Sequence, residues 1–391
     1  MAKVYSRGAS QGIGLKSSLG RCWRINFAVS RQPRRGVDLS VGVMRLCAVR
    51  VSSVGEVMPL EKRVAVTLPL NQSLQDTIDL VRWAESNGYR DGWFSDPGAP
   101  DGLAMAAAIA AHTQTLRIGM AIVPVYTRTP TVLAAMTDVI GQALPGRFVL
   151  GLGASSQTIM QAFNGIDLDK PLTRVKETAI VVRSILAGEK TAFTEMQTVY
   201  SRGYKQDPSI PEIPIYIAAL RPKMIEMAAE YGDGVIFNLW PRDALPKMME
   251  HVKVGAERAG KDWRDIEIVN RAMVHVTEDK EEGRALFRAH FAPYFANPVY
   301  NRFLEWCGYP DIAAEIQEGW AARDRERTTG AFSDEVIDAI GVIGTKEEVR
   351  ARIREDANAG ITTSIISPIG RVELDVAYQT FEPFRADQFE L

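Results

Sequence analysis

The sequence has few of the residues that hold metal ions or disulfides. It contains three cysteines and four histidines among 391 residues, and Cys307 is the only cysteine beyond residue 57. A single cysteine in the main part of the chain excludes an internal disulfide framework and favours a reducing compartment, so we expect a cytoplasmic protein. The histidines are scattered, without a His-x-x-x-His or Cys-x-x-Cys spacing, and we therefore predict no metal site.

A large excess of charge and long apolar runs are missing as well. The formal net charge is −2, which gives no reason to expect nucleic acid or an anionic membrane as a partner. No run of about 18 apolar residues occurs, so we predict no membrane span. A P-loop is also missing, and no Gly-x-Ser-x-Gly elbow occurs after residue 57. The composition is that of an ordinary soluble globular protein.

Residues 1–57 differ from the rest of the chain. They carry ten Lys or Arg against two acids and show no sustained helical or strand period. Residues 8–14 resemble the nucleotide loop of short-chain dehydrogenases, but they lack the buried strand before it and the helix after it. The segment suits either a basic targeting sequence or an upstream extension of a chain whose native start is Met58. We favour the extension, expect it to be disordered or loosely attached, and place the main domain at 58–391.

Strands and helices alternate regularly after residue 62. We predict eight strands, at 63–68, 92–96, 116–123, 147–153, 213–219, 235–239, 266–276 and 363–367. Ser73 and Asp101 are predicted to start two of the intervening helices, and 278–340 reads as a long, mostly helical region. Eight such units over about 310 residues favour an α/β fold of the closed (β/α)₈ barrel type over an open sheet.

The fourth predicted strand ends in two glycines and two serines. Its apolar run suits a strand buried on both faces, and it leads into Gly153, Ala154, Ser155 and Ser156. Glycines at this end let the backbone come close to a ligand, and free N–H groups with hydroxyls can hold an anion. In barrels, ligands bind at the carboxyl ends of the strands.

Two further strand ends carry residues suited to a cofactor. Residues 123–130 follow the third strand, and their prolines predict an irregular main-chain ridge, with Arg128 available to an anionic group. Residues 218–224 follow the fifth strand, and the helix that starts at Pro222, with Arg221 and Lys223, predicts an anion site. The alternatives are a purely structural loop and solvated charges at a helix start.

Three single residues complete the candidates. Asp96 ends the second strand and could donate a proton or serve as a turn residue. Asn238 ends the sixth strand and could hydrogen-bond a ring or ribityl group. His275, near the end of the seventh strand, could act as an acid or base or could simply be packed there.

Several short motifs resemble those of the bacterial luciferase-like flavin or deazaflavin oxidoreductases. They lie at 116–119 with 124–126 and Pro130, at 146–153, at 214–219 with 222–224, at 228–235, at 343–345 with 347–349, and at 359–361. The resemblance runs from about residue 62 to 370 and is closest to the F420-dependent branch, which includes methylenetetrahydromethanopterin reductases. It implies a (β/α)₈ barrel, a cofactor at the strand ends, a third-strand bulge between 122 and 126 that often has a cis peptide, and a homodimer.

The resemblance and the strand-end residues together predict an oxidoreductase that uses coenzyme F420. A reduced-FMN-dependent monooxygenase and a flavin-binding barrel without turnover are the alternatives. The predicted cofactor-binding residues are Val123, Pro124, Val125, Tyr126, Gly153, Ala154, Ser155, Ser156, Ala218, Ala219, Leu220, Arg221, Pro222, Lys223, Met224 and Asn238. Asp96 and His275 are the predicted catalytic residues, and Arg128 the predicted substrate-binding residue. Many relatives have His or Glu where this chain has Asp96, and 278–340 is expected to shape the substrate pocket.

Overall fold

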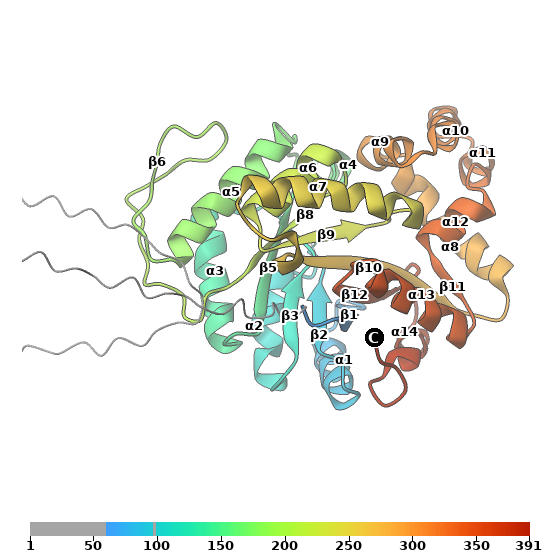
Figure 1. Cartoon of the computed structure of the whole chain (residues 1–391), viewed down its shortest axis with the longest axis horizontal. Helices are drawn as coiled ribbons and strands as arrows, with labels where there is room; N and C mark the ends of the chain where they lie inside the picture. The colour runs from blue at the N-terminus through green and yellow to red at the C-terminus, as the bar shows by residue number, and fades with distance from the viewer. Residues whose placement is uncertain (1–59, 97–98) are drawn as a thin grey trace, which may run out of the picture. The chain divides into compact units, whose positions relative to one another are not determined.

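Eight strands form a closed parallel barrel in the computed structural model, which describes residues 60–96 and 99–391 (Figure 1). In order around the barrel they are β1 (Arg63–Leu68), β2 (Asp91–Phe94), β3 (Arg117–Met120), β5 (Phe148–Gly153), β8 (Ile215–Ala218), β9 (Gly234–Asn238), β10 (Glu267–Val276) and β12 (Thr363–Pro368). Strand β12 pairs with β1, which closes the ring. The predicted (β/α)₈ barrel is therefore confirmed. The predicted extension at 1–57 lies outside the described residues.

Helices connect the strands and form the outer layer. They are α1 (Leu74–Ser86), α2 (Gly102–Ile109), α3 (Pro130–Ala143), α4 (Gln157–Asn164), α5 (Pro171–Leu186), α6 (Pro222–Tyr231), α7 (Leu245–Arg258), α8 (Lys280–Phe295), α9 (Pro298–Cys307), α10 (Pro310–Ala321), α11 (Arg325–Gly330), α12 (Asp334–Ile340), α13 (Lys346–Asn358) and α14 (Leu374–Phe381). Within the described part of the chain, no helix is long and apolar enough to cross a membrane.

The predicted helix starts follow from side-chain capping. Ser73 Oγ accepts a hydrogen bond from the Asp76 amide at 3.1 Å and begins α1. Asp101 Oδ1 accepts one from the Ala104 amide at 2.9 Å and begins α2. Each cap satisfies an amide that the first helical turn leaves without a partner.

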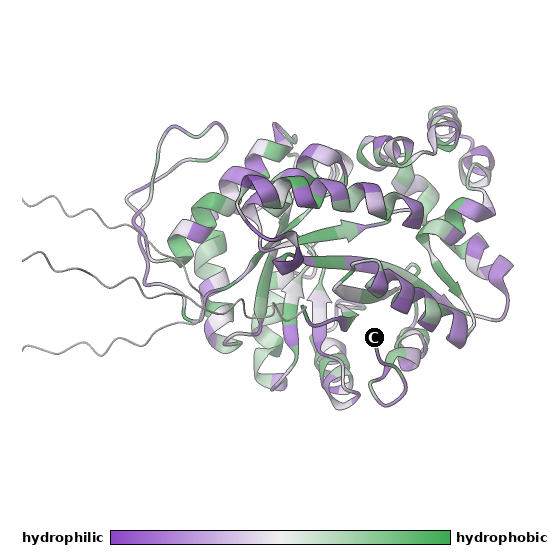
Figure 2. Cartoon of the chain, in the orientation of Figure 1, coloured by the Kyte–Doolittle hydropathy of each residue, from purple (hydrophilic) through white to green (hydrophobic). Residues whose placement is uncertain are grey.

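Apolar side chains fill both sides of the barrel wall. Strands β9 and β10 are largely apolar, whereas polar residues lie along the outward side of helices such as α13 (Figure 2). The cluster inside the barrel comprises Ala65, Trp93, Val149, Tyr216, Ile236, Val269 and Ile365. A larger cluster lies between the strands and the surrounding helices. This two-sided burial explains why the strands read as continuous apolar runs.

An ionic layer occupies the amino-terminal end of the barrel interior. The Arg117 guanidinium donates to Asp91 Oδ1 at 3.1 Å and to Glu267 Oε1 at 2.7 Å. Arg63 adds a second cation, 3.2 Å from Glu267 Oε1. Burial by itself would raise the pKa of Glu267, but the bonds from Arg117 hold it below its ordinary value. The layer joins β1, β2, β3 and β10 at the end opposite the strand termini.

Strand β10 continues beyond the barrel and carries the long helical region. It has ten residues, and its last three pair with β11 (Val342–Gly344); of these, only Val274 also pairs with the barrel strand β12. Helices α8 to α12 lie between β10 and β11 in sequence and gather together in space, drawn orange to red in Figure 1. They enclose a separate apolar cluster that includes Phe287, Phe295 and Phe332. The predicted helical region at 278–340 is thus confirmed.

Candidate active site

The barrel places most of the predicted cofactor segments on consecutive strands. Strands β3, β5, β8 and β9 are neighbours in that order. Residues 123–126 follow β3, 153–156 follow β5, 218–224 follow β8, and Asn238 ends β9. Because the carboxyl ends of parallel strands meet at one rim, these segments share one side of the barrel mouth.

A bulge interrupts the third strand. Strand β3 stops at Met120, and pairing with β5 resumes at β4 (Val123–Pro124). The peptide bond between Ala121 and Ile122 is cis, so the irregular backbone begins one residue before the predicted range of 122–126. Both residues are partly exposed and pack against the apolar cluster inside the barrel. The bulge therefore presents a main-chain ridge at the barrel mouth.

The glycines of β5 make room for this bulge. A Cβ on Gly151 would lie 1.7 Å from the carbonyl oxygen of Met120, and one on Gly153 would lie 2.8 Å from Cγ1 of Ile122. We expected these glycines to let the backbone approach a ligand. In the structure, the space that they leave is occupied by the neighbouring bulge.

The residues after the bulge are mostly buried. Val123 and Val125 are completely buried and Pro124 is buried, so the exposed part of the bulge is at Ala121 and Ile122. The Tyr126 hydroxyl donates to the carbonyl oxygen of Asp169 at 2.6 Å, and partial burial raises the pKa of Tyr126 to about 12. Tyr126 therefore ties the loop before α5 to the bulge.

Helix α6 begins at the same rim without a side-chain cap. Its N-cap residue is Arg221, and Pro222 occupies the first turn, as predicted. Arg221 and Lys223 are exposed, and neither forms an ion pair within the described residues. An uncapped first turn beside two unpaired cations favours an anion.

The loop after β5 lies beside α6 because β5 pairs with β8. Ser155 has a left-handed backbone with φ of 63°, and Ser156 Oγ accepts a hydrogen bond from the Ile159 amide at 3.3 Å. Ser156 is therefore the N-cap of α4, a helix that we did not predict. Its hydroxyl proton is still available to an acceptor.

Asp96 and Arg128 are bound to each other. Arg128 Nη1 lies 2.7 Å from Asp96 Oδ2, and the Gly102 amide donates to Asp96 Oδ1 at 3.2 Å. Arg128 also donates to Asp101. With both oxygens of Asp96 engaged, the geometry does not favour proton donation by Asp96 or substrate binding by Arg128.

His275 lies apart from the other candidates. It is on the part of β10 that pairs with β11, opposite Ile343. A Cβ on Gly283, in α8, would lie 3.1 Å from Cδ2 of His275. The ring thus packs against the start of α8 rather than facing the barrel mouth, which agrees with the alternative of a packed histidine.

A polar cluster at the mouth contains one predicted residue, Asn238, and others that were not predicted. Asn238 Nδ2 donates to the Tyr300 hydroxyl at 2.9 Å, while Asn238 Oδ1 is buried without a hydrogen-bond partner. Arg271 Nε donates to Ser367 Oγ at 3.1 Å. A charged residue in the middle of a mostly apolar predicted strand was the signal for Arg271. Tyr300 comes from the helical insertion, and no local pattern connects it to Asn238.

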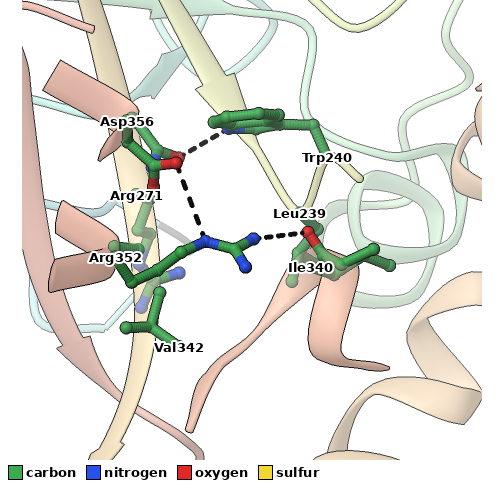
Figure 3. A pocket seen from close by; sticks show the side chains of 10 residues that line it. Leu239, Trp240, Arg271, Ile340, Val342, Arg352 and Asp356 are labelled. Atoms are coloured by element: carbon green, nitrogen blue, oxygen red, sulfur yellow. Dashed lines mark hydrogen bonds and ion pairs between the residues drawn. The ribbon is translucent and has the colours of Figure 1, made fainter. Parts of the chain in front are cut away.

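A small cavity lies on the outer side of the barrel wall. It measures about 10 Å³ and is lined by Trp240, Asn270, Arg352 and Asp356, among others (Figure 3). Arg242 Nη2 donates to Asp356 Oδ1 at 2.9 Å, and Arg352 Nη2 donates to the Ala339 carbonyl oxygen at 2.9 Å. This volume suits about one water molecule, so the cavity belongs to the packing of α13 and not to a ligand site.

The described residues contain no group of three or more His, Cys, Asp or Glu side chains that could hold a metal ion. The groups at the mouth that remain free are instead the bulge main chain, the amino terminus of α6, the Asn238 oxygen and the Arg271 guanidinium. They are hydrogen-bonding and cationic groups around an apolar floor. Such a site suits a flat organic molecule with anionic substituents.

Comparisons with known proteins agree in family and fold. The family model described as luciferase-like monooxygenase matches residues 54–363. A 5,10-methylenetetrahydromethanopterin reductase from Methanolobus tindarius is 28% identical over 294 residues, covering 74% of this chain and 89% of the relative. A Mycobacterium tuberculosis protein that is named as a coenzyme F420-dependent oxidoreductase is 25% identical over 321 residues, covering 76% and 91%.

A solved structure has the same fold. The coenzyme F420-dependent tetrahydromethanopterin reductase from Methanopyrus kandleri superposes with a TM-score of 0.69 at 20% identity, covering 83% of this chain and 98% of that chain. At this identity, the likeness concerns the barrel and its connections.

Proposed function

Since this chain belongs to the luciferase-like monooxygenase family and is an oxidoreductase, we propose that it uses coenzyme F420 for hydride transfer to or from a small organic substrate. The observation that carries the proposal is the similarity to a methylenetetrahydromethanopterin reductase across 89% of that enzyme's length. A relative and a solved structure that are both named for coenzyme F420 support it. We further propose a homodimer, which light scattering on the purified protein would test.

The residues at the barrel mouth fit such a cofactor. The ridge at Ala121–Ile122 is a surface for one face of a ring, and the uncapped start of α6 with Arg221 and Lys223 suits a phosphate. Asn238 Oδ1 is a buried acceptor without a donor, which a ring or ribityl group with an N–H or O–H would satisfy. Bound F420 would supply hydride chemistry at C5 of its deazaflavin.

The chain itself would contribute binding, orientation and exclusion of water. The apolar floor under the mouth includes Trp93 and Ile236, which are almost completely buried. The helices α8 to α12 provide the longest insertion among the described barrel connections and would cover the substrate. Asp96 and His275 remain proposed catalytic residues, although the ion pair of Asp96 and the packing of His275 favour structural roles.

The alternative function is a reduced-FMN-dependent monooxygenase, which the description of the family favours. Purified apoprotein titrated separately with F420 and with FMN distinguishes the two proposals. We expect saturable F420 binding, followed by fluorescence, and much weaker FMN binding. Tight FMN binding without F420 binding would overturn the proposal, and F420 binding without turnover of any electrophile would favour a non-catalytic barrel.

The phosphate site can be tested separately. We expect Arg221→Ala with Lys223→Ala to weaken F420 binding by about tenfold or more, since charge-assisted hydrogen bonds to phosphate are lost. A matched control is Lys190→Ala with Arg302→Ala, which removes two exposed cations elsewhere. Equal affinities for the two double variants would exclude residues 218–224 from the cofactor site.

A further inference from the structure

Arg271 is a cation without a counterion inside the barrel. Along β10, Val269 belongs to the cluster inside the barrel, and Arg271 follows two residues later, so its side chain points to the same interior side. Its only side-chain hydrogen bond within the described residues is from Nε to Ser367 Oγ. Its two terminal nitrogens therefore keep their donors free, and no carboxylate of the described chain forms an ion pair with it.

The other arginines of the barrel interior are paired. Arg117 and Arg63 both contact carboxylates in the ionic layer at the opposite end. Burial lowers the pKa of Arg271, but an arginine keeps its proton in proteins. An unpaired guanidinium in such a place is unfavourable for folding unless a ligand supplies the anion.

Arg271 lies across the mouth from the bulge. The bulge follows β3 and Arg271 is on β10, the third and seventh of eight strands, so four strand positions separate them in either direction. A flat ring that rests on the bulge would turn its other face toward β10. The anion site at α6 follows β8, between the two, and would take the phosphate end of the cofactor. Arg271 is thus on the side left for a second molecule.

The surroundings of Arg271 suit an oxyanion at the edge of the proposed cofactor site. Arg271 pairs in register with Asn238, whose Oδ1 is buried without a partner. The Tyr300 hydroxyl lies next to both, receives the bond from Asn238 and keeps its proton, because burial raises the pKa of Tyr300 well above its ordinary value. A carboxylate could therefore accept hydrogen bonds from the free terminal nitrogens of Arg271, next to the Asn238 amide that the proposed function assigns to the cofactor.

We propose that Arg271 recognises a carboxylate of the substrate, so that the enzyme acts on an organic acid. This inference rests on the proposed function, since it takes the bulge side of the mouth for the cofactor. The same guanidinium chemistry could instead meet a carbonyl of the cofactor ring. The opposite placement of β3 and β10 favours the substrate, and the experiment separates the two.

The test is calorimetric titration of the full-length, F420-loaded protein with acetate, succinate, glutarate and benzoate, each compared with its amide. We expect at least one acid to bind saturably and its amide not to bind. Arg271→Met should weaken that acid by about tenfold or more, Arg271→Lys should weaken it less, and Arg302→Met, on exposed α9 surface, should have no effect. The thermal midpoint of Arg271→Met should be unchanged or higher, because an unpaired, partly buried charge is removed.

Other outcomes overturn the inference. They are equal binding of acid and amide, no binding of any acid, or unchanged affinity in Arg271→Met. A tenfold loss of F420 affinity in Arg271→Met would place the guanidinium at the cofactor and would also overturn it. If the wild-type protein binds no F420, the proposed function fails, and the same titration of the apoprotein then decides the carboxylate site by itself.

Discussion

Both oxygens of the buried Asp96 carboxylate are engaged in contacts that stabilise the fold. It is 5% exposed, and its oxygens are held by Arg128 and by the first amide of α2. Arg128 in turn contacts Asp101, the N-cap of the same helix. The arginine therefore joins the loop after β4 to the start of α2, and its charge is used for that contact.

Replacing Arg128 by methionine should destabilise the protein. The change leaves Asp96 buried without its cation, and we expect the free energy of unfolding to fall by about 3 kcal/mol. Adding Asp96→Asn to that variant should restore part of the loss, because the uncompensated charge disappears. Urea denaturation measures all three proteins.

Asp101→Asn is the matched control for this pair. Asn is also a good N-cap residue and the Asp101 side chain is 42% exposed, so we expect a loss of less than about 1 kcal/mol. An Arg128→Met variant that is no less stable than Asp101→Asn would show that the ion pair between Arg128 and the buried Asp96 contributes little to stability.

Single residues were the hardest features to predict from the sequence. Asp96 and Asn238 were placed correctly at strand ends, since that depends on local pattern. Their partners Arg128 and Tyr300 are 32 and 62 positions away, and such contacts depend on tertiary packing. The same limit applies to His275, because only the pairing of β10 with β11 turns it toward α8.

At the scale of elements, the bulge after β3 and the glycines of β5 form one unit. Each needs the other, because the bulge occupies the space where two β5 side chains would be. The bulge main chain is also the proposed surface for the cofactor ring. A change in β5 should therefore affect cofactor binding through the bulge, without a direct contact.

Gly153→Ala should weaken F420 binding and stability together. Its Cβ would meet the Ile122 side chain at 2.8 Å, and we expect a loss of about 1–3 kcal/mol in the free energy of unfolding. Combining it with Ile122→Ala should recover much of the stability, because the clashing atoms are removed. Thermal denaturation and F420 titration of both variants check this, and an equally unstable double variant would contradict it.

The packing of α13 predicts a pH dependence of stability. Burial raises the pKa of Asp356 from 3.8 to about 6, despite the bond from Arg242. A raised pKa means that the folded protein binds the proton more tightly than the unfolded chain. The contribution of Asp356 is therefore most favourable below pH 3.8 and is lost as the pH rises to about 6.

Asp356→Asn isolates this effect. Relative to the variant, the wild-type protein should lose about 1–3 kcal/mol of unfolding free energy between pH 4 and pH 6.5. Urea denaturation at a series of pH values gives the difference directly. A constant difference across that range would mean that Asp356 has an ordinary pKa in the folded protein.

Most elements could be predicted because buried parallel strands are apolar runs bounded by glycine or proline. Strand β1 has the predicted bounds, and β5, β9 and β10 differ by one residue. Helix α4 was not predicted, and the cis peptide at Ala121–Ile122 begins one residue before the predicted bulge. They depend on how a loop packs against the neighbouring strand and not on its own periodicity.

At the scale of the whole molecule, the ionic layer connects strands that are far apart in sequence. Arg117 on β3 contacts Asp91 on β2 and Glu267 on β10, a strand on the opposite side of the barrel. Since the barrel mouth is at the other end, the layer bears on stability and not on chemistry.

Arg117→Met should therefore destabilise the protein without changing its ligand affinity. Two buried carboxylates lose their main cation, and we expect a loss of about 3–5 kcal/mol in the free energy of unfolding. The control Arg264→Met breaks an exposed pair with Asp262 and should leave stability unchanged. F420 affinity, measured below the thermal midpoint, should be the same in all three proteins, and a selective loss in Arg117→Met would contradict this division of the barrel.

Strand β10 belongs to two structures at once. Its residues up to Val274 pair with barrel strands and include Arg271, and its last three residues pair with β11, which follows the insertion of α8 to α12. The insertion can therefore change in sequence and length while β10 keeps its place in the barrel wall and its arginine. We expect homologues that have an arginine at this position but a different insertion to share a preference for organic acids and to differ in which acid they accept.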